Sequence, residues 1–260
     1  MPAVLQEHRD KTLIVRINRP EKFNALSREM ILALTEIFIS LTTESDLRAI
    51  VLTGTGDKAF CAGTEIAELS AAGTDSAKAR ELSERGQALC NQIERCGVPV
   101  IAAINGIAAG GGCELALACH LRIASENAQF SLPETKLGVI PAYGGTQRLA
   151  REIGHGRASD IMLSGRTINA TEALEFGLVN YVVSPADLLL HARALAQEIA
   201  QLAPLAIRAC LEAVTRGTDL PLAEGLALET KLFASLFATE DVREGTSAFL
   251  EKRKPVFKGK

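Results

Sequence analysis

The chain has 260 residues, of which 47% are apolar and 23% charged, and its formal net charge is −3. This length fits one large domain, or a domain with an appendage. The small negative charge argues against nucleic acid or an anionic membrane surface as the main partner.

The first two thirds of the chain alternate between strand and helix patterns. Strands are predicted at residues 11–20, 47–54, 98–105, 120–125 and 178–183, and helices at residues 26–41, 71–95, 111–118 and 169–177. Buried strands that alternate with helices are typical of an α/β core with parallel pairing.

The pattern changes after Ser184, where only helical periodicity continues. Helices are predicted at residues 186–216, with a break near Pro204, and at residues 221–238 and 242–253. We therefore place a boundary near residue 190, between a core of residues 1–190 and a helical region of residues 191–260.

Several classes of protein are disfavoured by what the sequence lacks. No segment has the pattern of a signal peptide, and the longest apolar stretch, residues 98–113, is short for a membrane span. The six cysteines form no C-x-x-C pair and no metal-type cluster with the four histidines. We expect a cytoplasmic protein with free thiols, no membrane association and no metal site.

One glycine pattern is misleading. Residues 54–59, "GTGDKA", follow a predicted strand and match the start of a dinucleotide-binding fingerprint. That fingerprint must open a helix, and the "FCAG" that follows interrupts any helix within a few residues. A dinucleotide site is not expected.

The stretch "NGIAAGGGCELALACH" places a glutamate in an apolar run, one turn past three glycines. If a helix starts near Gly111, its first N–H groups have no intrahelical acceptor and form an oxyanion donor. Glu114 then lies on the same helix face and looks into the same space. The alternative is that Glu114 only stabilises the helix dipole, a contribution of about 0.3–1 kcal/mol.

Two further segments have features of a site. In "AFCAGTEIAEL", Gly63 allows a sharp turn between a strand-like piece and a helical pattern. In "SLPETKLGVIPAYGGTQRL", a glycine-bearing loop follows Glu134. Glu134 also has a purely structural explanation, because Ser131 and Glu134 have the spacing of a capping box.

The chain order is "AFCAGTEIAEL", "NGIAAGGGCELALACH" and "SLPETKLGVIPAYGGTQRL", with "NRPEKFNAL" near the start and "EGTSAFLEKRKPVFKGK" at the end. Together these segments resemble the enoyl-CoA hydratase/isomerase (crotonase) family. The resemblance covers essentially the whole chain. It implies a fold of stacked ββα units with a C-terminal helical region that serves assembly and covers the CoA site. It also implies a homotrimer, or a homohexamer built from two trimers.

The resemblance also implies roles for individual residues. The backbone N–H groups of Thr64 and Gly111 would hold a thioester oxygen, and Glu114 and Glu134 would be the two catalytic carboxyl groups. Substrate or CoA contacts would come from Lys22, Phe23, Ala62, Gly63, Ile66, Pro133, Pro141, Ala142 and Tyr143. No cofactor is implied, since CoA is part of the acyl-CoA thioester substrate.

The sequence departs from the family pattern near the acyl group. Ala142 replaces a glycine whose N–H helps to hold water, and Tyr143 adds a large ring that either shapes the pocket or only packs. The presence of both glutamates favours an enoyl-CoA hydratase that adds water syn across a 2-enoyl-CoA. The alternatives are an isomerase or lyase on the same scaffold, or a non-catalytic protein that binds acyl-CoA or, through its basic tail, RNA.

Overall fold

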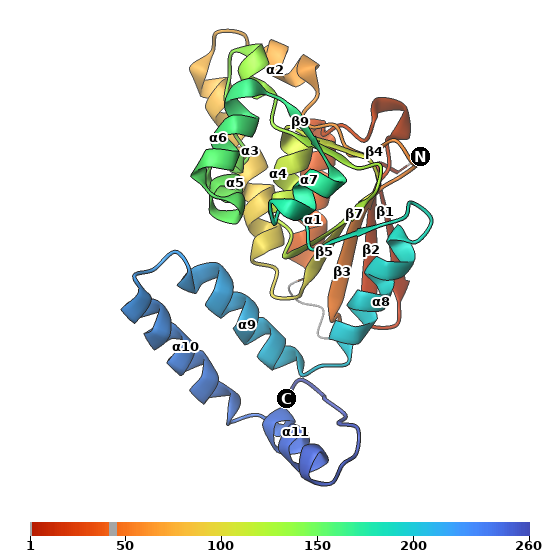
Figure 1. The fold of residues 1–260 in the computed structure, drawn as a ribbon, viewed down its shortest axis with the longest axis vertical. Coiled ribbons are helices and arrows are strands. Elements are labelled where there is room, and N and C mark those ends of the chain that lie inside the picture. Colours follow the sequence, from red (N-terminus) through yellow and green to blue (C-terminus); the bar gives the residue numbers. More distant parts are fainter. Residues whose placement is uncertain (1, 42–45) are drawn as a thin grey trace.

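The computed structural model describes residues 2–41 and 46–260 as two β-sheets surrounded by helices (Figure 1). The six-stranded sheet has the order β1-β2-β3-β5-β7-β10 and is parallel except for the β1–β2 hairpin. Its strands are β1 (Val4–Arg9), β2 (Thr12–Ile17), β3 (Ala49–Gly54), β5 (Val100–Ile104), β7 (Leu121–Ser125) and β10 (Tyr181–Val183).

A four-stranded sheet lies beside it, with the order β4-β6-β8-β9. Its strands are β4 (Ala59–Cys61), β6 (Ile107–Ala109), β8 (Gln129–Ser131) and β9 (Thr167–Asn169), and only β9 is antiparallel to its neighbour. β3–β4, β5–β6 and β7–β8 each pass from the large sheet to the small one. Each of the first two pairs is followed directly by helices, and this is the predicted ββα unit.

The helices cover both faces of the large sheet. They are α1 (Arg28–Ser40), α2 (Ile66–Ala72), α3 (Ser76–Glu94), α4 (Gly111–Leu117), α5 (Gly145–Ile153), α6 (His155–Ser164), α7 (Ala170–Glu175), α8 (Leu188–Ala200), α9 (Pro204–Gly217), α10 (Leu222–Leu236) and α11 (Glu240–Leu250). On one face, α1, α3 and α4 pack into the main core, and on the other α8 packs against residues such as Val51 and Ile101. A boundary at residue 190 would fall inside α8, and the division into two domains stays a prediction.

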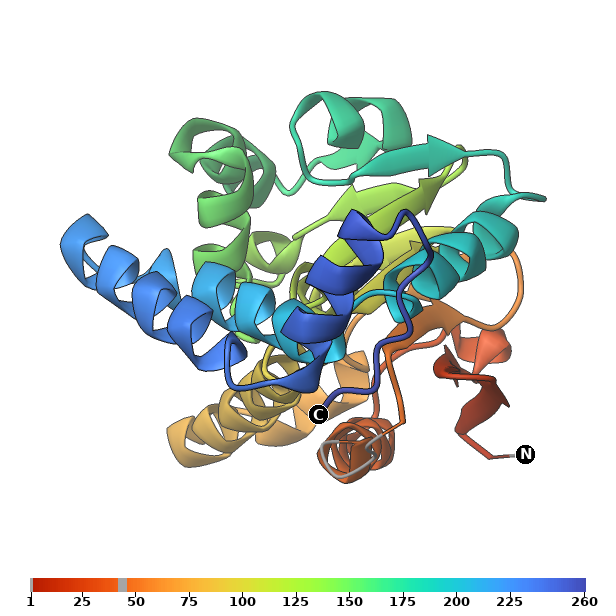
Figure 2. The same cartoon turned by 90° about the horizontal axis from the view of Figure 1, so that it is seen from below.

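The C-terminal arm, which we define as residues 204–260, projects away from the sheets (Figures 1 and 2). Helices α9 and α10 pack against each other, and neither contains a buried residue. Apolar side chains are exposed along the arm, with Leu222 78% and Phe233 63% accessible. The chain end folds back onto α11, where the Asp241 carboxylate accepts the N–H groups of Lys258 and Gly259.

Some predicted elements have different limits. The helix expected at residues 71–95 is divided into α2 and α3, because Gly73 adopts a positive φ of 55° and Asp75 caps a new helix. The strand expected at 178–183 is reduced to β10. Of the six cysteines, all free, five are buried and Cys210 on α9 is exposed.

Candidate active site

The first candidate oxyanion donor is the N–H group of Gly111 at the start of α4. Gly110 precedes the helix with a positive φ of 52° and turns the chain out of β6. As the first helical residue, Gly111 has no intrahelical acceptor for its N–H. No other hydrogen bond from this N–H is present among the described residues, so it is free to bind a ligand.

The second candidate donor, the Thr64 N–H, lies next to the first. Gly63 has a positive φ of 95°, and a Cβ built on it would lie 2.6 Å from the Ala109 oxygen and 3.2 Å from the Gly111 nitrogen. Only glycine permits this approach of the two segments. Within the described residues, the Thr64 N–H also makes no hydrogen bond, so two unpaired donors lie on adjoining segments.

Glu114 is buried, with 2% of its surface exposed, and has specific partners. One carboxylate oxygen, Oε1, accepts the N–H of Tyr143 at 2.7 Å and of Gly145 at 2.6 Å. Burial raises the pKa of Glu114 to about 7; the Gly145 N–H opposes this, and neighbouring Glu134 adds to it. A carboxyl group that has a pKa near 7 and keeps one oxygen available is suited to proton transfer. The dipole-only explanation of Glu114 does not account for this burial.

Glu134 begins the 3₁₀ helix η3 (Glu134–Leu137), directly after Pro133. Its oxygen Oε2 is buried without a hydrogen-bond partner among the described residues, and burial raises its pKa. The predicted capping box is wrong: Ser131 belongs to β8, and no side chain caps η3. A buried, unpaired carboxyl oxygen is costly for the fold, which indicates a ligand-facing role rather than a structural one.

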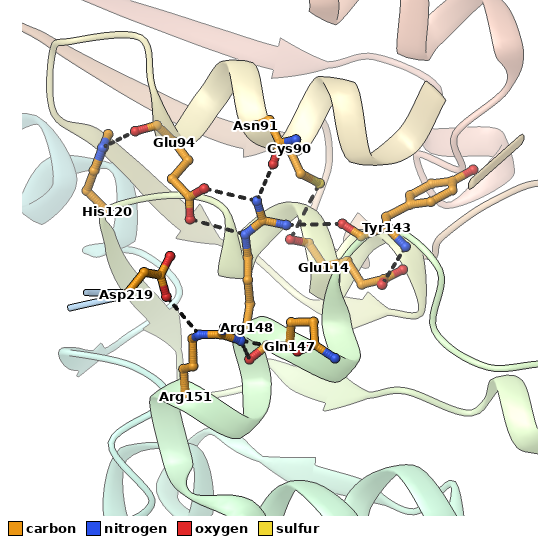
Figure 3. Close-up of polar contacts among 10 residues, drawn as sticks. All are labelled: Cys90, Asn91, Glu94, Glu114, His120, Tyr143, Gln147, Arg148, Arg151 and Asp219. Atoms are coloured by element: carbon orange, nitrogen blue, oxygen red, sulfur yellow. Dashed lines mark hydrogen bonds and ion pairs between the residues drawn. The ribbon is translucent and has the colours of Figure 1, made fainter. Parts of the chain in front are cut away.

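A charged network holds the loop that binds Glu114. Figure 3 shows the Arg148 guanidinium between Glu94 and Asn91 of α3 and the Tyr143 carbonyl. Arg148 binds both oxygens of Glu94, at 3.2 and 3.1 Å, and donates to the Tyr143 oxygen at 3.2 Å. A bidentate guanidinium–carboxylate pair fixes direction as well as distance. The network therefore fixes the loop whose N–H groups hold Glu114.

One cavity of about 100 Å³ is lined by the two carboxyl groups, Glu114 and Glu134, and by the donor segments of Thr64 and Gly111. All the predicted site residues line it except Lys22, Phe23 and Pro141. Lys22 ends the 3₁₀ helix η1 (Pro20–Lys22), and the Phe23 carbonyl accepts the Ala62 N–H at 3.0 Å, so this segment lies beside the cavity wall. Pro141 lies close to Gly145, whose added Cβ would be 3.0 Å from the Pro141 Cβ.

Part of the cavity lining and its support was not predicted from the sequence. The unpredicted lining residues are Leu69, Leu82, Gly110, Leu137, Val139 and Ile140. Leu137, Val139 and Ile140 fall between Glu134 and the glycine loop, and this adjacency was an available signal. Leu69 and Leu82 lie on helices whose orientation the sequence does not define, and Arg148 was hidden in a helix that was not predicted.

Across residues 2–41 and 46–260, no group of three or more His, Cys, Asp or Glu side chains is arranged to hold a metal ion. In the same part of the chain, every helix is too short or too polar to cross a lipid bilayer.

Sequence comparison places the chain among proteins of known type. A model of the enoyl-CoA hydratase/isomerase family matches residues 7–260. The chain is 40% identical to the short-chain-enoyl-CoA hydratase of Clostridium acetobutylicum, over 96% of this chain and 95% of that protein. It is 43% identical to the (E)-benzylidenesuccinyl-CoA hydratase of Thauera aromatica, over the full length of both.

A solved structure supports the same assignment. The crystal structure of an enoyl-CoA hydratase from Bacillus anthracis superposes with a TM-score of 0.95 at 40% identity, covering 100% of both chains. This confirms the predicted α/β fold of stacked ββα units with a C-terminal helical region. The chain belongs to the enoyl-CoA hydratase/isomerase family.

Proposed function

We propose that the protein is an enoyl-CoA hydratase, a hydro-lyase that adds water syn across the 2,3 double bond of a 2-enoyl-CoA. The observation that carries the proposal is that Glu114 and Glu134 line one cavity with the Thr64 and Gly111 segments. Hydration needs a base, an acid and an oxyanion site at once, and each has a candidate here.

The thioester oxygen is bound by the N–H groups of Thr64 and Gly111. When water attacks Cβ, the electrons of the double bond move toward the carbonyl, and negative charge develops on this oxygen. Two fixed donors stabilise that charge, and loss of one such donor typically reduces the rate by about 10²–10³-fold. Because both donors are backbone groups, this role does not depend on the side chain at position 64.

The two carboxyl groups divide the proton transfers. Glu114, ionised in a substantial fraction of molecules near neutral pH, takes a proton from water as the oxygen bonds to Cβ. Glu134, whose pKa is also raised, delivers a proton to Cα. Their titrations are coupled through the shared cavity, so the pair has joint apparent pKa values. Transfer of the proton from Glu114 back to Glu134 within the shared cavity restores both groups, so water and the thioester together supply every atom of the product, and no cofactor is invoked.

The CoA part of the substrate extends over the cavity mouth. Ile66 and Phe23 are 61% and 46% exposed and lie beside Ala62 and Gly63. These apolar surfaces are suited to the pantetheine arm and adenine. Lys22 at the end of η1 supplies a positive charge for the phosphates. Pro133 and Ala142 line the cavity, and Pro141 lies beside Gly145 outside the lining.

We further propose that the arm assembles the protein into a homotrimer or a homohexamer. Helix α10 and its C-cap residue expose Leu222, Leu226, Phe233 and Phe237, and neither α9 nor α10 contains a buried residue. Contiguous exposed apolar surface of this kind is typical of an interface.

The test is loss of the enoyl-thioester absorbance when purified protein is mixed with crotonyl-CoA, alongside Glu114→Ala and Glu134→Ala. We expect turnover by the wild type and a loss of at least about 100-fold in each variant. A fully active Glu114 variant would contradict the assigned roles. A wild type that is inert on short, long and aromatic 2-enoyl-CoAs would remove the hydratase proposal and favour an isomerase, a lyase or a binding protein.

A further inference from the structure

We propose that Tyr143, held in a notch made by Gly86, is the end wall of the acyl site and restricts the substrate to small, straight 2-enoyl groups such as crotonyl. This inference rests on the proposed hydratase function for its substrate class. Sequence identity does not decide the acyl group, since a short-chain-enoyl-CoA hydratase and an (E)-benzylidenesuccinyl-CoA hydratase are 40% and 43% identical to this chain.

The Tyr143 ring fills the space between α3 and α4. The residue is only 3% exposed. A Cβ built on Gly86 of α3 would lie 2.0 Å from the ring, and one built on Gly111 of α4 would lie 3.1 Å from it. The ring therefore occupies a position that exists only because residue 86 has no side chain.

Several hydrogen bonds hold the ring and its loop in place. The Tyr143 hydroxyl is hydrogen-bonded to the Thr64 hydroxyl at 2.9 Å, and its backbone N–H and carbonyl bind Glu114 and Arg148. The preceding Ala142 carbonyl accepts hydrogen bonds from Ser83 and Gln87, which flank Gly86 on α3. Because hydrogen bonds hold both the hydroxyl and the backbone of Tyr143, the ring has a fixed position and forms a rigid wall.

The position of the wall decides which acyl groups fit. At the mouth of the cavity, Ile66 and Ile140 are 61% and 65% exposed, whereas Glu114 and Tyr143 are almost fully buried. CoA therefore lies at the mouth, and the acyl chain points inward toward the ring. The volume of about 100 Å³ is far below that of a site for a large ligand, typically about 300–1,000 Å³.

The experiment compares kcat/KM for crotonyl-CoA, 2-hexenoyl-CoA and 2-octenoyl-CoA in the wild type, Tyr143→Ala and Tyr143→Phe. We expect the wild type to prefer crotonyl-CoA. Tyr143→Ala should raise the octenoyl-to-crotonyl ratio at least about tenfold, the usual scale for apolar pocket changes. Tyr143→Phe keeps the ring and should keep the ratio. Tyr181→Ala, at the exposed second tyrosine, is the matched control.

A second pair of variants tests the notch itself. Gly86 does not line the cavity, yet Gly86→Ala should push the ring into it and lower the octenoyl-to-crotonyl ratio further. In the double variant with Tyr143→Ala, the effect of the alanine at position 86 on the ratio should disappear. Thermal melting identifies misfolding of Gly86→Ala, and the two Tyr143 variants then decide the matter alone.

The outcomes for this inference and for the hydratase function are separable. Calorimetry with butyryl-CoA and octanoyl-CoA measures selectivity without any reaction. If the wild type hydrates nothing but Tyr143→Ala shifts binding toward octanoyl-CoA, the hydratase proposal fails and the wall is supported. The wall proposal is overturned if hydration proceeds and Tyr143→Ala changes neither the octenoyl-to-crotonyl ratio of kcat/KM nor the relative affinity for octanoyl-CoA and butyryl-CoA. It is also overturned if the wild type prefers octenoyl-CoA.

Discussion

The core around the site and the C-terminal arm are built in opposite ways. Around the site, the buried Glu114 carboxylate accepts the N–H groups of Tyr143 and Gly145, and Glu134, with one unpaired oxygen, lines the same cavity. In the arm only Asp241 and Ala248 are buried, and Phe233 and Phe249 are 63% and 84% exposed. The cavity is thus formed entirely by residues of the core, whereas the surface of the arm is suited to contacts with another molecule.

The largest effect is expected from polar substitutions in the exposed apolar surface of the arm. We expect Leu226→Asp with Phe233→Asp to abolish assembly, because charges would then lie at the centre of an apolar interface. Light scattering coupled to gel filtration would show the mass fall from that of a trimer or hexamer to that of one chain. A wild type that is already monomeric would contradict the assembly proposal. Lys231→Asp, a charge change on the same helix at an already polar position, is the matched control.

Two arginines on α5 allow a finer comparison, because one has its partners in the core and the other has its partner in the arm. Arg148 binds Glu94 and the Tyr143 carbonyl within the core, whereas Arg151 pairs with Asp219 of the arm. We expect Arg148→Gln to lower kcat about 10–100-fold, since a misplaced loop weakens the positioning of Glu114. Arg151→Gln should change kcat little, because exposed ion pairs contribute little.

The pH profile checks that explanation. The positive charge of Arg148 lowers the pKa of Glu114, so its removal should move the acid limb of kcat to higher pH. Groups that also influence this carboxyl are Glu134 of η3 and the backbone N–H groups of Gly145 and Tyr143. An Arg148→Gln enzyme with an unshifted acid limb would leave only a general structural role for this arginine.

The smallest expected effect is on the free energy of unfolding, which the buried carboxyl group of Glu114 lowers at high pH. Glu114 has a folded-state pKa of about 7 against an ordinary value of 4.5, so the fold favours its neutral form. As the pH rises from 4.5 to 7, the unfolded chain loses this proton first, and the carboxyl increasingly destabilises the fold. Glu114→Gln should therefore be more stable than the wild type at pH 8, by about 1–3 kcal/mol, but not at pH 4.

Urea denaturation at the two pH values measures this difference directly. Gln is a close isostere of Glu and keeps an oxygen that can accept the two loop N–H groups. Gln6→Glu, at an exposed residue, serves as a control for nonspecific charge effects. Equal stability gains at pH 4 and pH 8 would contradict a proton-linked cause.

The site was partly predictable because its donors and acids follow local rules. A helix starting at Gly111 places Glu114 one turn later, and the structure has this helix. The capping interpretation of Glu134 failed because Ser131 is committed to pairing with Ala109 and Thr167 in the small sheet. Local spacing could not reveal that competing tertiary partner.

The contacts that define the acyl wall were beyond sequence reasoning. The Tyr143 ring meets Gly86 across two segments far apart in the chain, and their relative placement comes from tertiary packing. Nothing about a glycine within a helical pattern indicates that a ring will occupy its side. The same applies to Arg148, whose partners lie on α3 and not on its own helix.

The distribution of thiols also gives the arm a built-in chemical reporter. Burial raises the pKa of Cys61 and Cys90 to about 12 and that of Cys96 to about 11, so these thiols react slowly with alkylating reagents. Cys113 and Cys119 are buried as well, which leaves Cys210 on α9 as the accessible thiol. A fluorophore attached there, without any substitution, would sense whether α9 is covered by a neighbouring molecule.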